Sequence, residues 1–247
     1  MNYPNHKEKH GKEAFFTPED YLKYAKAKFK EVPKKIIIVY YEYLANHFKD
    51  KYDTKSIKFG GRQNIYVHKD IGVILMSGIG SPHVTTALEE MIALGAKEIL
   101  NIGSAGELVS EGTFLCTKAI RDEGVSHHYL AHELFSYPDE HLTKKLDKSM
   151  KKNKINFEKG ATWTIDAPYR ETKDEIKHYR DLGVKTVEME ASAIFSVAKY
   201  RGVKAASAFH VSDLLVDNYT PMFEKEHMQN SLKKLLDSAI NVFLEND

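Results

Sequence analysis

The chain has 247 residues, a length at which a single α/β domain can bury one large core. Its 36 Lys and Arg side chains balance 35 Asp and Glu side chains, so no basic excess indicates nucleic acid or a membrane surface as a partner. The single cysteine excludes an intramolecular disulfide, and no apolar stretch approaches the roughly 18 residues of a membrane span. Because the polar N-terminus lacks the apolar core of a signal peptide, we expect a cytoplasmic protein.

Short apolar runs alternate with amphipathic stretches along the chain, which predicts one α/β domain over residues 1–247. The first expected helix covers residues 18–31, where acidic residues come early, lysines come late, and Pro33 ends the segment. A second helix is expected from Val84 to Gly95 and a third from the acidic pair near residue 190 to Tyr200. Buried strands are predicted at residues 36–39, 72–76, 98–102 and 203–213.

Glycine-rich turns are expected after two of these strands. Residues 77–80 (SGIG) follow one strand and precede a helix, and residues 103–106 (GSAG) follow the next. Ligands in open α/β sheets bind at the carboxyl ends of strands, so both turns are candidate binding loops, although turn geometry alone could also require the glycines. Neither turn matches the dinucleotide fingerprint or the ATP phosphate loop, so binding of those cofactors is not expected.

Charged, hydroxyl and imidazole side chains crowd residues 118–129 (KAIRDEGVSHHY). Such a segment lines a polar ligand or forms a solvated loop whose charges pair with one another. The adjacent His127 and His128 lack the spacing of a zinc motif, so no metal is expected.

Two carboxylate features mark the C-terminal third. In residues 187–191 (VEMEA), Glu188 and Glu190 flank Met189 just before an apolar helix. These acids could simply favour the helix dipole, or a carboxylate could accept hydrogen bonds from two adjacent sugar hydroxyls while Met189 forms an apolar wall. Asp213 ends the strand over residues 203–213, where it could carry chemistry or, with Ser212, cap the next segment.

Together these segments resemble the nucleoside phosphorylase and nucleosidase superfamily over most of the chain. The resemblance implies a single-domain, doubly wound α/β fold with a mixed central sheet flanked by helices. It also implies a homo-oligomer, either a dimer or a hexamer built as a trimer of dimers, in which residues 1–32 help the interface and a neighbour completes each site. The stretches that carry it are residues 78–108, AIRDEGVSHHYL (119–130), TIDAPYRET (164–172), VEMEASAIFSVAKYRGVKAA (187–206) and VSD (211–213).

The resemblance also implies roles for particular residues in cleaving the bond between a base and a sugar. Glu190 would bind the ribose hydroxyls, Met189 would pack on the sugar, and Glu188 would lie beside the base. Asp213 would be the general acid toward purine N7, which suits a departing base that gains negative charge. The remaining implied substrate contacts are Gly80, Ser104 (to phosphate or the attacking water), Ser126, His127, Tyr169, Arg170 and, across a subunit interface, Lys58.

The resemblance defines the attacking nucleophile less well than the bond that is cleaved between base and sugar. The family's phosphorylases bind phosphate through arginines at three positions, which are occupied here by Ala45, Asn101 and Lys58. Phosphorolysis with inorganic phosphate as co-substrate and no other cofactor remains the first expectation, with purine slightly ahead of uridine. Replacement cations could come from Arg121, Arg62, Lys58, His6 or His10.

Two alternatives stay open. Residues 101–108 (NIGSAGEL) resemble methylthioadenosine and adenosylhomocysteine nucleosidases, which use water and a glutamate of the first loop, and Glu42 lies in that loop. The chain could instead bind nucleosides without cleaving them, but a pure binder has no need for an acid such as Asp213.

Overall fold

The computed structural model describes residues 3–4, 6, 9–25, 31–59, 63–215 and 219–245. Within these residues, eleven strands form one mixed sheet. The strands are β1 (Lys35–Val39), β2 (Lys55–Phe59), β3 (Gln63–His68), β4 (Ile71–Leu75), β5 (Glu98–Glu107), β6 (Thr113–Asp122), β7 (Phe135–Ser136), β8 (Phe157–Ile165), β9 (Val184–Glu188), β10 (Lys204–Leu214) and β11 (Thr220–Pro221).

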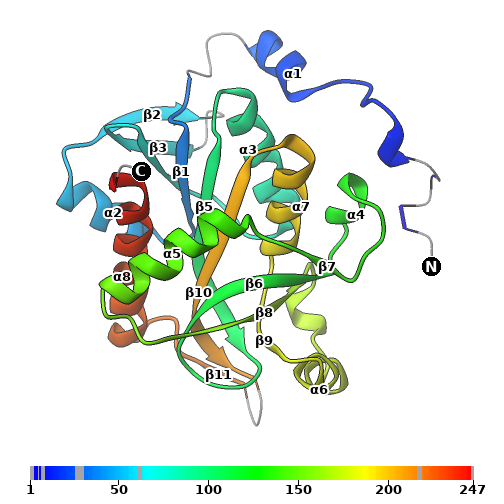
Figure 1. Ribbon diagram of the computed structural model, residues 1–247, viewed down its shortest axis with the longest axis vertical. Coiled ribbons are helices and arrows are strands. Elements are labelled where there is room, and N and C mark those ends of the chain that lie inside the picture. The colour runs from blue at the N-terminus through cyan, green and yellow to red at the C-terminus, as the bar shows by residue number, and fades with distance from the viewer. Residues whose placement is uncertain are drawn as a thin grey trace.

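Helices cover the sheet on both sides, as Figure 1 shows, which confirms the predicted α/β fold with a mixed sheet. Helices α3 and α7 pack together on one side, and α5 and α8 pack together on the other. The α-helices are α1 (Pro18–Ala25), α2 (Glu42–Lys51), α3 (Ser81–Ala93), α4 (Ser126–Tyr129), α5 (Glu140–Lys152), α6 (Lys173–Asp181), α7 (Ala191–Arg201) and α8 (Glu226–Leu244), and the 3₁₀ turns are η1 (Lys9–Gly11) and η3 (Pro168–Arg170).

Part of the sheet closes on itself. Strand β10 pairs with both β5 and β6, β6 pairs with β8, β8 with β9, and β9 returns to β5. Strands β1, β4, β3 and β2 extend the sheet outward from β5. Five strands therefore form a ring, and the carboxyl ends of β5, β9 and β10 lie next to one another.

Two apolar clusters hold the helices to the sheet. One includes Val84, Leu88 and Ile194 from α3 and α7, and the other includes Leu146 and Leu236 from α5 and α8. Every residue of α7 from Ala191 to Ala198 is buried, including Ser192 and Ser196, as expected for a helix enclosed by other elements. It ends at Gly202, whose φ of 68° is the left-handed conformation of a helix C-cap.

Most predicted elements are present, but one predicted turn is not. The expected strands at 36–39, 72–76 and 203–213 correspond to β1, β4 and β10. The first expected helix is present as α1, and residues 26–30 of that prediction lie outside the described part. The predicted turn at residues 103–106 is wrong, because these residues continue β5 and pair with β10. Gly106 is needed there because a Cβ atom would lie 2.8 Å from Leu215 Cδ1 and 2.9 Å from Val187 Cγ1.

A third apolar cluster surrounds the single tryptophan, Trp163, on β8. The indole is fully buried and its Nε1 donates a hydrogen bond of 2.9 Å to Asp122 Oδ2. Trp163 is paired with Val187 of β9, directly before Glu188. No helix in the described ranges is long and apolar enough to cross a membrane.

Candidate active site

Three neighbouring strands bring the candidate catalytic residues to one edge of the sheet. In the β5–β10 pair, His210 lies opposite Ser104, and a register shift after Val211 then places Asp213 opposite Gly106. On the other side of β5, Gly106 lies opposite Val187, one residue before Glu188. Ser104, Glu188 and Asp213 thus come from adjacent strands, although up to 109 residues separate them in the sequence.

Glu190 stands at the N-cap position of α7 and links that helix to α3. Its Oε1 accepts a hydrogen bond of 2.5 Å from the backbone amide of Gly80, the N-cap of α3. Gly80 has a φ of 99°, a conformation that favours glycine, and Ser81 Oγ donates to the carbonyl of Met189 at 2.7 Å. Burial raises the pKa of Glu190, so this carboxyl holds its proton to higher pH than an exposed glutamate.

Glu188 accepts three hydrogen bonds from the protein itself. Its Oε2 accepts from the backbone amides of Glu190 at 2.8 Å and Ala191 at 2.7 Å, and its Oε1 accepts from Thr164 Oγ1 at 2.5 Å. These bonds satisfy amides at the start of α7 that have no partner within the helix. Burial raises the pKa of Glu188, and repulsion from Glu190 raises it further. The contacts assign Glu188 to holding the loop that carries Glu190.

Asp213 has fewer partners than Glu188. Its Oδ1 accepts a hydrogen bond of 2.7 Å from Ser212 Oγ, and burial raises its pKa. Glu171, the residue after η3, lies close enough for the charge of Asp213 to act on it. Burial and that charge raise the pKa of Glu171 to about 7. A raised pKa increases the fraction of an aspartate that carries a proton at a given pH, which is what a general acid requires.

Two tyrosines follow β1 at the same edge. Tyr40 donates a hydrogen bond of 2.9 Å to Oδ1 of the fully buried Asn101, whose Nδ2 donates to Ser207 Oγ at 3.3 Å. Tyr41 and Ser104 share a hydrogen bond of 2.7 Å between their hydroxyl groups. Burial raises the pKa of both phenols, and nearby carboxylates raise it further, so both hydroxyls stay protonated at neutral pH.

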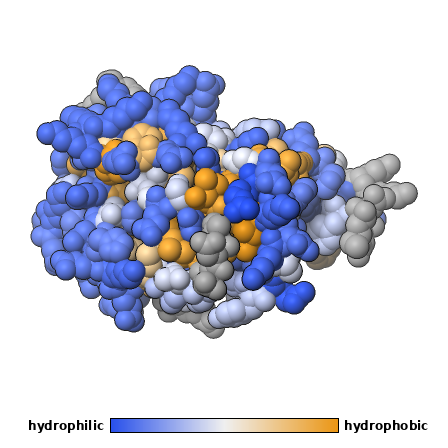
Figure 2. All heavy atoms as spheres, turned by 90° about the horizontal axis from the view of Figure 1, so that it is seen from below, coloured by the Kyte–Doolittle hydropathy of each residue, from blue (hydrophilic) through white to orange (hydrophobic). Residues whose placement is uncertain are grey.

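The edge is therefore acidic in the described part of the chain. Glu188, Glu190 and Asp213 are the charged groups that raise the pKa values of Tyr40 and Tyr41. Strands β5 and β10 end toward the bottom of Figure 1, so Figure 2, which is seen from below, faces this edge and shows apolar side chains gathered among hydrophilic ones.

Ala45, at one of the three phosphate-arginine positions, is buried in α2. No group of three or more metal-binding side chains lies within the described ranges.

The polar segment at the end of β6 and directly after it forms a closed network. Arg121 donates through Nε to Ser126 Oγ at 3.0 Å, and through its terminal nitrogens to the carbonyls of Leu130 at 2.9 Å and Ala131 at 2.7 Å. His127 Nε2 donates to the carbonyl of Arg121 at 3.0 Å. Ser126 and His127 are buried, and their assignment to substrate remains a prediction. Arg121 is committed to the loop, so it has no free donor set for phosphate.

Several other predicted contacts are exposed within one protomer, and Tyr169 and Arg170 among them lie on the turn that leads to Glu171. Tyr169 is 99 % exposed and Arg170 is exposed on η3. Lys58 is exposed on the edge strand β2, which β3, β4 and β1 separate from β5. Glu42 is exposed on α2, and His10 Nε2 donates to the carbonyl of His127 at 2.7 Å. His6 is exposed, and Arg62 lies outside the described residues.

Sequence reasoning did not single out Tyr40, Tyr41 or Glu171 as members of the site. The two tyrosines could have been found from their position, since they follow a buried strand directly at the carboxyl edge. Glu171 lies inside the 164–172 stretch, but nothing in that pattern indicates that it approaches Asp213.

Comparison with known proteins places this arrangement in a family. Residues 36–243 match the model of the phosphorylase superfamily, and the chain belongs to that superfamily. A guanosine phosphorylase from Halorubrum lacusprofundi is 26 % identical over 176 residues, which cover 69 % of this chain and 73 % of the relative. A uridine phosphorylase from Haemophilus influenzae is 28 % identical over 158 residues, covering 57 % and 63 % respectively.

Solved structures show the same fold. An AMP nucleosidase from Bacteroides thetaiotaomicron superposes with a TM-score of 0.77 at 18 % identity, covering 94 % of this chain and 100 % of the other. A uridine phosphorylase from Vibrio fischeri superposes with a TM-score of 0.78 at 20 % identity, covering 90 % and 100 %. At these identities the likeness establishes the fold alone.

Proposed function

We propose that the protein cleaves the N-glycosidic bond of a nucleoside, with a purine slightly favoured as the base. The observation that carries the proposal is the meeting of Glu190 and Asp213 at one sheet edge, where β5 lies between the strands that lead to them. Glu190 is the acceptor for the ribose hydroxyls, and Asp213 is the acid for the base. The superfamily assignment supports the same chemistry.

The reaction makes opposite charges at its two ends. As the bond from C1′ to the base nitrogen breaks, its electron pair moves to the base, and the sugar ring becomes positive. The carboxylate of Glu190 stabilises that positive charge, and a proton from Asp213 to N7 neutralises the base. The nucleophile's oxygen then bonds to C1′. General acid assistance of this kind contributes roughly 10²–10⁴ in rate.

Phosphate is the first nucleophile that we propose, because the curated relatives described above are phosphorylases. In the described residues of one protomer the edge is acidic, so phosphate binding requires a cation from a neighbouring copy. Lys58, exposed on β2, is the side chain that we assign to this task. A homo-oligomer is part of the proposal for that reason.

Hydrolysis is the second candidate, and a specific observation favours it. Tyr41 shares a hydrogen bond with Ser104 Oγ, and Nδ2 of Asn101 donates to Ser207 Oγ, so side chains at two positions where a phosphate-binding site needs donors are already engaged. Two protonated phenols among carboxylates suit a water molecule better than a phosphate dianion.

The experiment that separates these possibilities measures both products. The protein is incubated with inosine, adenosine, guanosine, uridine and methylthioadenosine, with and without phosphate, and free base and sugar 1-phosphate are quantified. Phosphate-dependent release with sugar 1-phosphate supports phosphorolysis, and release without phosphate supports hydrolysis. Binding of a nucleoside without release of base would overturn the proposed cleavage.

A further inference from the structure

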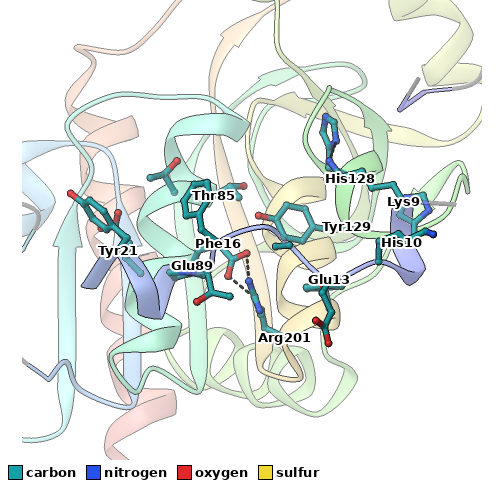
Figure 3. Close-up of a pocket in the computed structure, with 17 residues that line it drawn as sticks. Lys9, His10, Glu13, Phe16, Tyr21, Thr85, Glu89, His128, Tyr129 and Arg201 are labelled. Atoms are coloured by element: carbon teal, nitrogen blue, oxygen red, sulfur yellow. Dashed lines mark hydrogen bonds and ion pairs between the residues drawn. The ribbon is translucent and has the colours of Figure 1, made fainter. Parts of the chain in front are cut away.

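The N-terminal segment, which precedes α1, crosses the outer side of the molecule and is held at two places. Helix α1 packs against α3, and η1 packs against α4. Between these contacts every residue from 12 to 16 is exposed. A cavity of about 620 Å³ lies under this stretch, and its other wall comes from α3, α4 and α7, as Figure 3 shows. The segment therefore spans the cavity and depends on its two ends to stay in place.

His128 of α4 forms the contact at the η1 end, where Lys9 and His10 lie beside it in Figure 3. Its Nδ1 is 2.6 Å from Lys9 Nζ, and its Nε2 is 2.7 Å from the hydroxyl of Tyr3. The rings of Tyr3 and His128 meet edge to face, with their centroids 5.2 Å apart. A second bond joins the same regions, from His10 Nε2 to the carbonyl of His127 at 2.7 Å. His128 is thus held between two side chains of the segment.

The contact with Lys9 determines the protonation state of His128. An ammonium group has three donors and no acceptor, so Lys9 donates and His128 Nδ1 accepts with a free lone pair. The proton of the neutral ring then lies on Nε2, which donates to the Tyr3 oxygen. When a second proton binds at Nδ1, two positively charged donors face each other, and repulsion replaces the hydrogen bond.

The groups around His128 do not offset this new positive charge. Those that face it are Glu123, His127, Lys9, His10 and Tyr3. Glu123 carries a negative charge, but its oxygens already accept hydrogen bonds from two backbone amides and from the hydroxyl of Ser192. On the side of α7, the charge of Arg201 is paired with Glu89. The lysine and the three histidines therefore gather positive charge in one place when the pH falls.

This arrangement makes docking of the segment depend on pH. Burial lowers the pKa of His128 in the docked state, and the charge of Lys9 lowers it further. When the segment is released, the pKa returns toward the ordinary 6.5, so the released state binds a proton that the docked state does not. Docking is therefore most stable above about pH 7, and its equilibrium constant falls below pH 6.5 by up to about tenfold per pH unit.

We propose that the N-terminal segment is a pH-sensitive strap, which Lys9 and His128 hold over the cavity at neutral pH and release in acid. Release uncovers the cavity wall that contains Tyr129 and Tyr200, whose rings meet edge to face with centroids 5.5 Å apart. This inference rests on the contacts of the segment and not on the proposed catalytic function.

The test follows the mobility of the strap in the full chain with a fluorescent label. Phe15→Cys provides a fully exposed thiol, whereas Cys116, the single native cysteine, is buried, so a maleimide dye labels the strap selectively. We expect the anisotropy of the dye to fall as the pH drops from 8 to 5, with most of the change below pH 6.5. His128→Asn should remove this fall, because its amide oxygen accepts from Lys9 at every pH.

Reversal of one charge gives the sharper test. Lys9→Glu places a carboxylate beside His128, which binds the protonated ring more strongly than the neutral one, so the anisotropy should not fall with pH. Lys12→Glu is the matched control, because it makes the same change of charge in the exposed part of the same segment. The fall should persist in Lys12→Glu.

Three outcomes would overturn the proposal, with circular dichroism at each pH showing that the variants are folded. The first is a flat anisotropy profile between pH 8 and 5 in the labelled chain. The second is an unchanged fall in both His128→Asn and Lys9→Glu. The third is an equal loss of the fall in Lys12→Glu and Lys9→Glu, which would make it a response to the net charge of the segment and not to the contact with His128.

Discussion

Two polar regions of the molecule use their charged groups in opposite ways. In the segment from Arg121 to Ala131, each nitrogen of the guanidinium group meets an oxygen or an imidazole nitrogen of the same segment. At the acidic edge, Asp213 accepts one hydrogen bond from its neighbour Ser212, and burial raises the pKa values of Asp213 and Glu190. The first region is as polar as the second, but its polar groups are already paired.

The difference teaches how to separate structural from chemical residues. A buried charge that is fully hydrogen-bonded stabilises a conformation, and removing it leaves its partners unsatisfied. A buried carboxyl with few partners and a raised pKa remains available for proton transfer. The paired region should therefore respond to substitution in stability, and the acidic edge should respond in activity.

The largest effect is expected at the acidic edge itself. Asp213→Asn should lower kcat about 10²–10⁴-fold, because the departing base loses its proton donor while the shape of the site is kept. Steady-state release of base measures the effect, and Asp174→Asn, at an exposed position in α6, is the matched control. A kcat within threefold of the wild type would remove Asp213 from the mechanism.

In the paired region, Arg121→Met should destabilise the fold by about 2–4 kcal/mol, because the carbonyls of Leu130 and Ala131 lose a charged donor. Urea unfolding followed by circular dichroism measures the change, with the exposed Arg170→Met as control. If Arg121→Met lost activity but kept full stability, the contrast between the two regions would be wrong.

His210 lies on β10, a strand of the candidate site, but its side chain is hydrogen-bonded, so it tests whether pairing or location decides the effect of a substitution. His210 on β10 shares a hydrogen bond of 2.8 Å with Thr113, and burial lowers its pKa to about 4. Between pH 6.5 and 4 the unfolded chain binds a proton at this position that the folded protein does not, so acidification costs stability. Between pH 6.5 and 4, His210→Gln should lose about 2–3 kcal/mol less stability than the wild type, as measured by unfolding at each pH. Parallel pH curves for wild type and variant would contradict this account.

The smallest effect is expected at the hydroxyl pair of Tyr41 and Ser104 at the acidic edge. Tyr41→Phe frees the hydroxyl of Ser104 and removes an obstacle to an incoming anion. We expect kcat to stay within about threefold and the KM for phosphate to fall about two- to fivefold, since only ground-state binding changes. Tyr43→Phe, whose ring stacks on Tyr41, is the matched control. A large loss of kcat in Tyr41→Phe would instead assign its hydroxyl to the chemical step.

Local patterns in the sequence predict much of the fold. Strands β1 and β4 are short apolar runs, and α3 repeats its apolar residues with helical spacing, so each can be predicted from a short stretch of sequence. The prediction of a turn at residues 103–106 (GSAG) was wrong because it relied on small residues, which usually indicate a turn. Here they continue a strand that is paired on both sides, and the need for Gly106 comes from Val187 and Leu215, distant in the sequence.

Some residues of the candidate site could likewise be predicted from the sequence, and others could not. Glu190 and Asp213 could be singled out because each occupies a sheet or helix end that carries chemistry in α/β proteins. The hydrogen bonds of Arg121 to Leu130 and Ala131 could not be predicted, because its partners there are backbone carbonyls, which every residue possesses. The bond between Tyr41 and Ser104 joins residues 63 positions apart, and only the closed arrangement of strands brings them together.

Trp163 offers an optical probe of the loop that carries Glu190. As the only indole of the chain, it accounts for all tryptophan fluorescence. Its ring is fully buried, its Nε1 is bound to Asp122, and it lies opposite Val187 on the strand that ends at Glu188. Emission excited at the red edge of the absorption band should therefore respond when a ligand displaces that strand and shift to longer wavelength when the ring of strands opens to water. The protein can thus report on its own site without a chemical label.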